Sequence, residues 1–302
     1  MRTLPDPDLS LRDASDFVFD SGLCRKALRN PSPPSLAVVL REIVSGIHRL
    51  TVSCHLPEFT DHGLGHLCSL VDRLSRWSAS SSGAVPQLIV DGLSEEECAI
   101  LLLGTLLHDI GMLSQRPEDL PPGSPQAVAK PLRDIPTWVR RTHIPRMERV
   151  ARRLFDPASF PNVEPVLQRA LAVAKVHGSW PWKWNPADFV DRDAGLAALV
   201  AVAENCAHWI RHGLTLGRVL VESGKISIRF ARPPGTDTQL DPVFVALRNH
   251  YLLVRLYRDE LGQVGAELPS IGFDPSTGGP SAFAVELAGW ETLPIFKLKR
   301  PL

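Results

Sequence analysis

The side chains best suited to chemistry are a histidine and an aspartate that stand next to each other, His108 and Asp109. They close an apolar run that begins at Leu101, and Gly111 follows them. Helical spacing would carry both polar side chains to the buried end of this run, where an unpaired imidazole or carboxylate is costly. A divalent metal ion would satisfy both, because it accepts neutral imidazole nitrogen and carboxylate oxygen together. The simpler alternative is a histidine that pairs with its neighbour at a helix end.

Further histidines and one glutamate extend this pair into a set of candidate metal ligands. His62 and His66 are four residues apart, so on a helix they would share a face. Most of the set lies at or near an expected helix end, where a helical bundle could bring its members together. The candidate set is His62, His66, His108, Asp109, His143, His177 and Glu204.

Most of the added candidates also have a simpler interpretation. His62 could bond the backbone at a helix start, and the two single histidines further along the chain could be solvated helix ends. Glu204 could form a salt bridge with a nearby arginine, either Arg211 or Arg218. The candidate set therefore depends on whether the fold brings its members together.

Helical periodicity predicts the elements that would position these side chains. Ser94 and Glu97 form a capping box, which satisfies two backbone amides at a helix start, so a helix should begin there and end at His108. Pro145 suits the first turn of another helix, which would put His143 at the N-terminal end of that helix. Further helices are expected over about residues 36–50, 61–77, 164–176 and 193–212.

Composition and periodicity divide the chain into three parts. Residues 1–34 are polar and rich in proline and form an N-terminal lead-in, residues 35–213 form a helical domain, and residues 214–302 form an extension. The expected fold class is mainly α with a small α+β C-terminal extension. The extension is expected to hold a β-hairpin at 218–230, a helix at about 242–261 and a strand at 282–287.

Charge and cysteine usage narrow the classes of function. The chain has 33 basic and 33 acidic residues, and this zero net charge counts against a nucleic-acid binder that works through bulk electrostatics. The N-terminus lacks the apolar core of a signal peptide, and the longest apolar run, Ala99 to Leu107, is too short to span a bilayer. Five scattered cysteines without a C-x-x-C pair are typical of reduced residues in a cytoplasmic protein.

The histidine motifs follow one another in a fixed order along residues 36–212. They read Thr60-Asp61-His62-Gly63-x-x-His66, Leu107-His108-Asp109-Ile110-Gly111, Arg141-Thr142-His143 and Val176-His177-Gly178. This order resembles the HD-domain phosphohydrolase superfamily, whose members are helical bundles. It is most similar to a bacterial branch that carries a C-terminal extension and often occurs near chaperone-like ATPases or in defence loci. The resemblance implies an HD-type helical bundle for this chain.

The resemblance also implies one or two divalent metal ions, for which manganese, magnesium, iron, nickel, cobalt and zinc are all compatible. Asp109 would bridge two ions, and His143 and His177 match the positions that bind the second one. Whether His62 or His66 is the first histidine ligand stays open. The implied ligands are His66, His108, Asp109, His143, His177 and Glu204.

One position departs from the superfamily's pattern. Members close the site with an aspartate on a late helix, whereas the matching stretch of this chain reads Val202-Ala203-Glu204-Asn205. The extra methylene of Glu204 moves its carboxylate oxygens by about 1.5 Å, the length of one carbon–carbon bond. This departure motivates an alternative function in which the metal site is vestigial.

The function that the resemblance implies is a metal-dependent phosphohydrolase, which cleaves a nucleotide or related phosphate ester with a metal-activated water. Asp109 and His62 would be its catalytic side chains, with His62 protonating the leaving oxygen or binding phosphate. The candidate substrate-binding residues are Arg141, Arg146, Lys175 and Lys183.

Two other functions compete with this hydrolase. The first is a binding or regulatory module that senses a nucleotide, or docks on a protein partner such as an ATPase, without turnover. The second is a metal-dependent nuclease, which would need a basic track that the zero net charge does not favour. Nucleic acid is accordingly the less favoured partner, and no membrane partner is expected.

Overall fold

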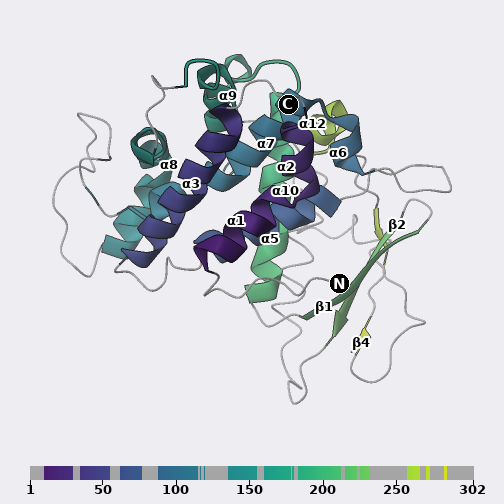
Figure 1. Cartoon of the computed structure of the whole chain (residues 1–302). Helices are drawn as coiled ribbons and strands as arrows, with labels where there is room; N and C mark the ends of the chain where they lie inside the picture. Colours follow the sequence, from purple (N-terminus) through teal and green to yellow (C-terminus); the bar gives the residue numbers. More distant parts are fainter. Residues whose placement is uncertain are drawn as a thin grey trace.

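The computed structural model describes much of the helical part of the chain and short parts of its C-terminal third. The described residues are 10–29, 35–54, 62–76, 88–114, 116, 119, 135–154, 160–177, 179, 183–211, 215–222, 225–231, 257–265, 270–272 and 282–283. Most of these residues lie in α-helices (Figure 1). The proline-rich segment 116–134 falls almost wholly outside the described residues.

The chain is mainly helical, as the periodicity predicts. The expected helices over 36–50, 164–176 and 193–212 are confirmed within one or two residues at each end. The helices are α1 (Leu11–Phe19), α2 (Gly22–Ala27), α3 (Ser35–Val52), α5 (Leu64–Arg76), α6 (Ile89–Gly92), α7 (Glu95–Leu107), α8 (Ile135–Leu154), α9 (Glu164–Lys175), α10 (Asp193–Arg211) and α12 (Arg258–Gln263), with short 3-10 turns η1 (Ile110–Met112) and η7 (Pro186–Asp188).

Helix α7 forms the centre of the bundle. The predicted capping box is confirmed, because Ser94 Oγ accepts the Glu97 amide at 3.1 Å and the Glu97 carboxylate accepts the Ser94 amide at 2.7 Å. Every residue from Glu97 to Leu107 is buried, and a helix that is buried on all sides must lie inside a bundle. It packs against α2, α3, α5, α9 and α10 (Figure 1). The end of α7 therefore carries His108 and Asp109 into the interior.

Helix α5 begins later than predicted. The Gly63 carbonyl accepts the Leu67 amide at 3.2 Å, and the helix runs from Leu64. His62 therefore lies in the turn before the helix, whereas His66 is in its first turn. The expectation that His62 and His66 share a helix face is wrong, because glycine at this position favours a helix start after His62.

Helix α8 also differs from the prediction. It begins at Ile135 and runs through Pro145 to Leu154, so His143 lies inside the helix and not at its mouth. Pro136 takes the first-turn position that was expected of Pro145. Pro145 cannot donate a bond to the carbonyl of Arg141, but both residues are exposed, so water can satisfy that carbonyl.

The last described helix returns to the bundle. Helix α12 packs against α10, and Tyr257, Leu261 and Val264 are buried in the main hydrophobic core. The Tyr257 hydroxyl donates to the Ser179 carbonyl at 2.7 Å, and its ring lies 5.6 Å from the ring of Trp184. The first part of the helix expected over 242–261 lies outside the described residues.

Short strands occupy the described parts of the remaining C-terminal chain. They are β1 (Thr215–Glu222), β2 (Lys225–Ala231), β3 (Ser270–Gly272) and β4 (Ala282–Phe283). Strand β2 pairs antiparallel with β1 and β4 and parallel with β3. Their interpretation as a separate α+β extension stays a prediction.

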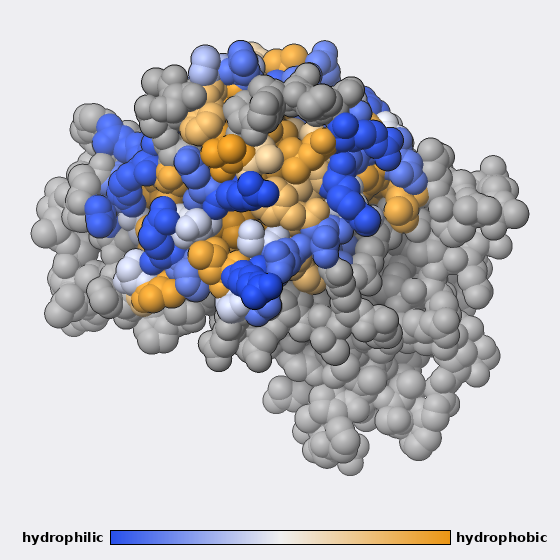
Figure 2. Space-filling view, viewed as in Figure 1, coloured by the Kyte–Doolittle hydropathy of each residue, from blue (hydrophilic) through white to orange (hydrophobic). Residues whose placement is uncertain are grey.

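The surface of the helices is mixed in character. On the face seen in Figure 2, hydrophobic side chains gather near the middle of the described helices and hydrophilic side chains surround them. Among the described residues, none of the helices combines the length and the apolar character that crossing a membrane requires.

The start of α7 gives a stability prediction. Glu97→Gln should keep the capping bond to Ser94 but lose the ion pair with Arg192, whose Nη2 lies 2.5 Å from Glu97 Oε2. Because Arg192 is partly exposed, we expect a loss of about 1 kcal/mol in the free energy of unfolding at pH 7, measured by urea denaturation.

The same loss should depend on pH. Burial raises the pKa of Glu97, but hydrogen bonds from Arg192 and Ser94 outweigh it, so this pKa lies below its ordinary value. The advantage of wild type over Glu97→Gln should thus be complete above the unfolded pKa of about 4.3, and be lost as the pH falls through the lower folded pKa. An unfolding difference that stays constant down to the most acidic pH at which both proteins fold would contradict this prediction.

Candidate metal centre

The fold brings all of the predicted ligand residues to one place, the inner end of α7. His108 caps the C-terminus of α7 and Asp109 follows it. The remaining members converge on this point from four other parts of the chain. They are His62 before α5, His66 in α5, His143 in α8, His177 after α9 and Glu204 in α10.

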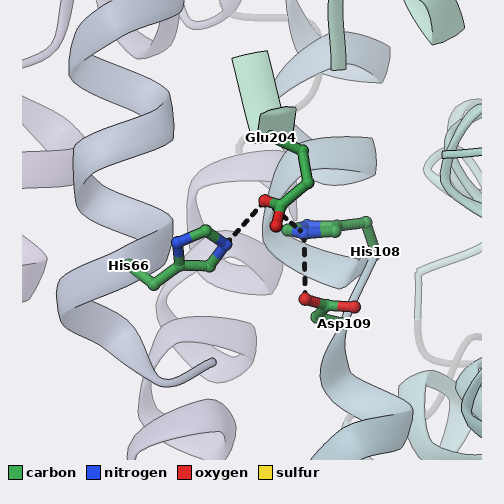
Figure 3. A group of neighbouring side chains, drawn as sticks. All are labelled: His66, His108, Asp109 and Glu204. Atoms are coloured by element: carbon green, nitrogen blue, oxygen red, sulfur yellow. Dashed lines mark ion pairs between the residues drawn. The ribbon is translucent and has the colours of Figure 1, made fainter. Parts of the chain in front are cut away.

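The first ligand group consists of His66, His108, Asp109 and Glu204, which point toward one another in Figure 3. Glu204 Oε2 lies 2.8 Å from His66 Nε2 and 3.3 Å from His108 Nε2. Asp109 Oδ2 lies 3.3 Å from the same His108 nitrogen. The four side chains are at most 9% exposed, so this group is closed to solvent.

The second ligand group consists of Asp109, His143 and His177. Asp109 Oδ1 lies 3.4 Å from His177 Nε2 and 3.9 Å from His143 Nε2, and the two histidine nitrogens are 3.4 Å apart. The side chain of His143 is 14% exposed, so this group is the more open of the two. Asp109 belongs to both groups and turns a different oxygen to each.

A hydrogen bond to the backbone fixes the ring of three of these histidines. Nδ1 lies close to the carbonyl oxygen three residues earlier in the chain, at 2.8 Å for His108, 2.6 Å for His143 and 2.7 Å for His177. A carbonyl oxygen only accepts hydrogen bonds, so Nδ1 carries the proton. In a neutral ring Nε2 is then left with its lone pair, and Nε2 is the atom that faces the carboxylates.

This arrangement fits a metal ion. A lone pair that faces an anionic oxygen is repelled unless a proton or a cation lies between them. Within the described part of the chain, His108 Nε2 makes no hydrogen bond, although carboxylate oxygens of Asp109 and Glu204 each lie 3.3 Å away. Histidine ligands commonly donate their other ring nitrogen to a backbone carbonyl, as these do. The mixed nitrogen and oxygen donors suit manganese, iron, cobalt, nickel or zinc better than magnesium, which prefers oxygen.

The charges of the two groups depend strongly on one another. Burial lowers the pKa of His108, but attraction to Asp109 and Glu204 outweighs it, so this pKa lies well above its ordinary value. Burial raises the pKa values of Asp109 and Glu204, but the neighbouring histidines outweigh it and hold both well below their ordinary values. Burial lowers the pKa of His143. At neutral pH both carboxylates are therefore ionised, as metal binding requires, and His143 is neutral. His108 is protonated there, so a bound metal ion would have to displace the proton on its Nε2.

Glu204 reaches the first group despite the departure from aspartate. Its carboxylate lies between His66 and His108, and Arg73 of α5 donates to the carbonyl of the preceding residue, Ala203, at 3.0 Å. This bond ties α5 to α10 next to the carboxylate. The side chain of Arg211 and that of Arg218 lie outside the described residues, so the salt-bridge alternative is not tested there.

His62 contacts the centre in a different way from the other histidines. Its Nδ1 lies 2.6 Å from Asp109 Oδ2, and both side chains are buried. It is not a member of either ligand group, whereas His66 belongs to the first. The geometry thus favours His66 over His62 as the first histidine ligand, which the sequence left open.

The two arginines predicted to bind substrate lie away from the ligand atoms. Arg141 is exposed and stands two residues before His143, which is about 160° around the helix from it. Arg146 is fully buried, with its guanidinium 4.2 Å from the ring centre of Trp138 and Nε donating to Thr142 Oγ1 at 3.1 Å. Full burial leaves Arg146 no surface to offer a substrate, so the structure does not support that role.

The two predicted lysines are nearer to solvent. Lys175, in the last turn of α9, forms an ion pair with Glu148 at 2.9 Å and is partly exposed. Lys183 is exposed in the segment after His177. Substrate binding by either lysine stays a prediction.

Sequence reasoning missed the groups that support the ligands. The backbone carbonyls that hold His108, His143 and His177 each come from three residues earlier, and a histidine at the end of a helix is the signal that could have found two of them. No sequence signal indicates that Arg73 reaches the backbone beside Glu204, because the two residues lie on different helices.

Comparison with known proteins agrees with this geometry. The family model HD-CE matches residues 56–204, a range that begins just before His62 and ends at Glu204. It includes every member of both ligand groups and is consistent with an HD-type domain. Neither the curated proteins nor the solved structures gave a match to the chain. The chain is thus similar to the HD-CE family over residues 56–204, the part that contains both candidate ligand groups.

Proposed function

We propose that this protein is a metal-dependent phosphohydrolase that acts on a nucleotide or a related phosphate ester. The observation that carries the proposal is the orientation of three histidines. In each, the Nδ1–H group donates a hydrogen bond to a backbone carbonyl, and Nε2 faces a buried carboxylate. The similarity of residues 56–204 to the HD-CE family supports the same chemistry.

In this proposal the two groups hold one ion each and share Asp109. His66, His108 and Glu204 complete the first group, and His143 and His177 complete the second. Two bound divalent ions would activate a water molecule as the nucleophile and neutralise charge on the phosphoryl oxygens.

The chain's own residues would orient the substrate and move protons. Substrate would approach from the side of His143, because the second group is the more exposed. Asp109 holds Nδ1 of His62 in a buried hydrogen bond, which fixes the orientation of that ring. As the phosphorus–oxygen bond breaks, His62 would give a proton from its other ring nitrogen to the leaving oxygen, and solvent would return one.

The organisation of the whole protein belongs to the same proposal. Residues 35–213 would form the catalytic HD-type domain and residues 214–302 an α+β extension that offers a surface to a protein partner such as an ATPase. The protein would act in the cytoplasm. The contacts of Glu204 with His66 and His108 favour this enzyme over a binding module with a vestigial site, because the longer side chain still brings its carboxylate to both histidines.

Metal content should depend on His108. His108→Ala should lower manganese affinity by more than about a hundredfold, because even residues that only support a ligand contribute 10- to 100-fold. Elemental analysis and calorimetric titration would measure the loss. His48→Ala, which changes a partly buried histidine of α3 outside both ligand groups, is the matched control and should bind metal as wild type does. Equal metal content in the two variants would contradict a metal centre at His108.

A second prediction tests whether Glu204 is a ligand. Glu204→Asp keeps the charge but withdraws the oxygens by about 1.5 Å, so we expect weaker binding of the first ion by about tenfold. Glu204→Gln removes the charge and should lose that ion. Manganese titration would rank the three proteins. Wild-type affinity in Glu204→Gln would show that the carboxylate is not a ligand and would favour the binding module.

A third prediction separates proton transfer from metal binding. His62→Asn should retain both manganese equivalents but lower kcat for phosphate release by about 10²- to 10⁴-fold. Asp109→Asn should lose both metal and activity. A panel of nucleotides and phosphate monoesters, assayed with manganese, would supply the substrate. Tight nucleotide binding by wild type without any product would overturn the hydrolase, and cleavage of single-stranded DNA or RNA alone would favour the nuclease.

A further inference from the structure

The turn that carries Asp109 is in unusually close contact with the helix that carries His143. A Cβ atom added to Gly111 would lie 2.7 Å from the carbonyl carbon and 2.9 Å from the Cα of His143, and nearer still to its carbonyl oxygen. Real Cβ atoms essentially never come within 3.0 Å of a heavy atom outside their own stretch of chain. The obstacle is backbone and not a flexible side chain, so any side chain at Gly111 would push α8 away from η1.

Arg146 holds the same junction one turn further along α8. Its buried guanidinium donates to the Ser114 carbonyl, just beyond η1, and to Thr142 Oγ1 at 3.1 Å. It also lies 4.2 Å from the centre of the Trp138 ring. Burial lowers the pKa of Arg146 to about 10, so it remains charged at neutral pH. Removing one partner of a buried charge is strongly destabilising, so these contacts resist separation of the two elements.

Of the two ligand groups, only the second takes a side chain from α8. The first group takes its side chains from α5, from α10 and from the end of α7, whereas His143 stands on α8. His143 Nε2 is 3.9 Å from Asp109 Oδ1, the longest of the three distances within the second group. A shift of α8 away from η1 would therefore lengthen the weakest contact of that group and leave the first group in place.

We propose that Gly111 and Arg146 are positioning residues for the second metal ion. The absence of a side chain at Gly111 and the buried guanidinium of Arg146 hold His143 beside Asp109 and His177. Neither residue contacts substrate in this inference. The inference rests on the two-ion centre of the proposed function. It adds that the packing of α8 against η1 is needed for the second ion to bind.

Manganese titration of the full chain tests the inference without an activity assay. Wild type should bind two equivalents. Gly111→Ala should bind the first with wild-type affinity and the second at least about tenfold more weakly, as for other residues that support a ligand. Gly92→Ala is the matched control, because a Cβ there meets nothing within 4 Å, and it should bind like wild type.

A double variant distinguishes positioning from a general loss of stability. His143→Ala removes a ligand of the second ion, so adding Gly111→Ala to it should weaken manganese binding no further. The effect of Gly111→Ala on thermal stability should persist in both backgrounds. Such non-additivity in binding alone is expected when both changes act on the same contact.

If Gly111→Ala does not fold, Arg146→Lys tests the positioning role of the junction. Lysine keeps the charge but cannot donate in two directions from a plane stacked on Trp138, so the second equivalent should again bind about tenfold more weakly. Folded Arg146→Lys protein that binds two equivalents like wild type, joined by Gly111→Ala where that variant folds, would overturn the inference and leave the proposed function intact. Two bound ions in wild type without hydrolysis would overturn the proposed function alone, and a wild type that binds no manganese would overturn both.

Discussion

The buried carboxylate of Asp109 is the group on which the centre depends, because its two oxygens face different partners. Oδ2 lies 2.6 Å from His62 Nδ1 and 3.3 Å from His108 Nε2, whereas Oδ1 lies 3.4 Å from His177 Nε2. A buried carboxylate is stable only when opposite charge or hydrogen-bond donors surround it. The fold places it there because α7 is buried on every side from Glu97 to Leu107, so the residues that end the helix lie inside the bundle.

The supporting hydrogen bonds make this centre rigid before any ion binds. Three histidines use the carbonyl of a residue in their own helix or turn, so each ring is oriented by a contact that is local in the chain. The tertiary structure then needs only to bring the helices together. Their burial has a cost, since the two carboxylates and His108 would be strongly unfavourable if they stood alone. Mutual attraction, and a bound cation in the proposed function, offsets that cost.

The sequence predicts what is local and fails where the answer depends on packing. The capping box of Ser94 and Glu97 fixes the start of α7. The candidate ligands of both groups lie together although the starts of α5 and α8 differ from the prediction, because the order of the helices along the chain was predicted correctly. The prediction that Pro145 begins a helix was wrong, because a proline inside a helix is tolerated when the carbonyl that it leaves unbonded is exposed. The prediction that Arg146 binds substrate was wrong, because the sequence alone does not distinguish an arginine that is buried in the fold from one that binds phosphate.

The difference in exposure between the two groups has a consequence for how the site would work. The side chains of the first group come from α5, α10 and the end of α7 and are at most 9% exposed, so this group is closed to solvent. The second group borders solvent at His143, whose side chain is 14% exposed, so in the proposed function it is the side from which substrate would approach. Gly111 packs against the backbone of His143, and this contact holds His143 in the second group. In the proposed function, helix packing would therefore affect catalysis through this contact. In the proposed function, buried charge would hold the inner ion, and the close backbone contact at Gly111 would hold His143 in place for the outer ion. A change at that contact would then weaken the outer ion without loss of the inner one.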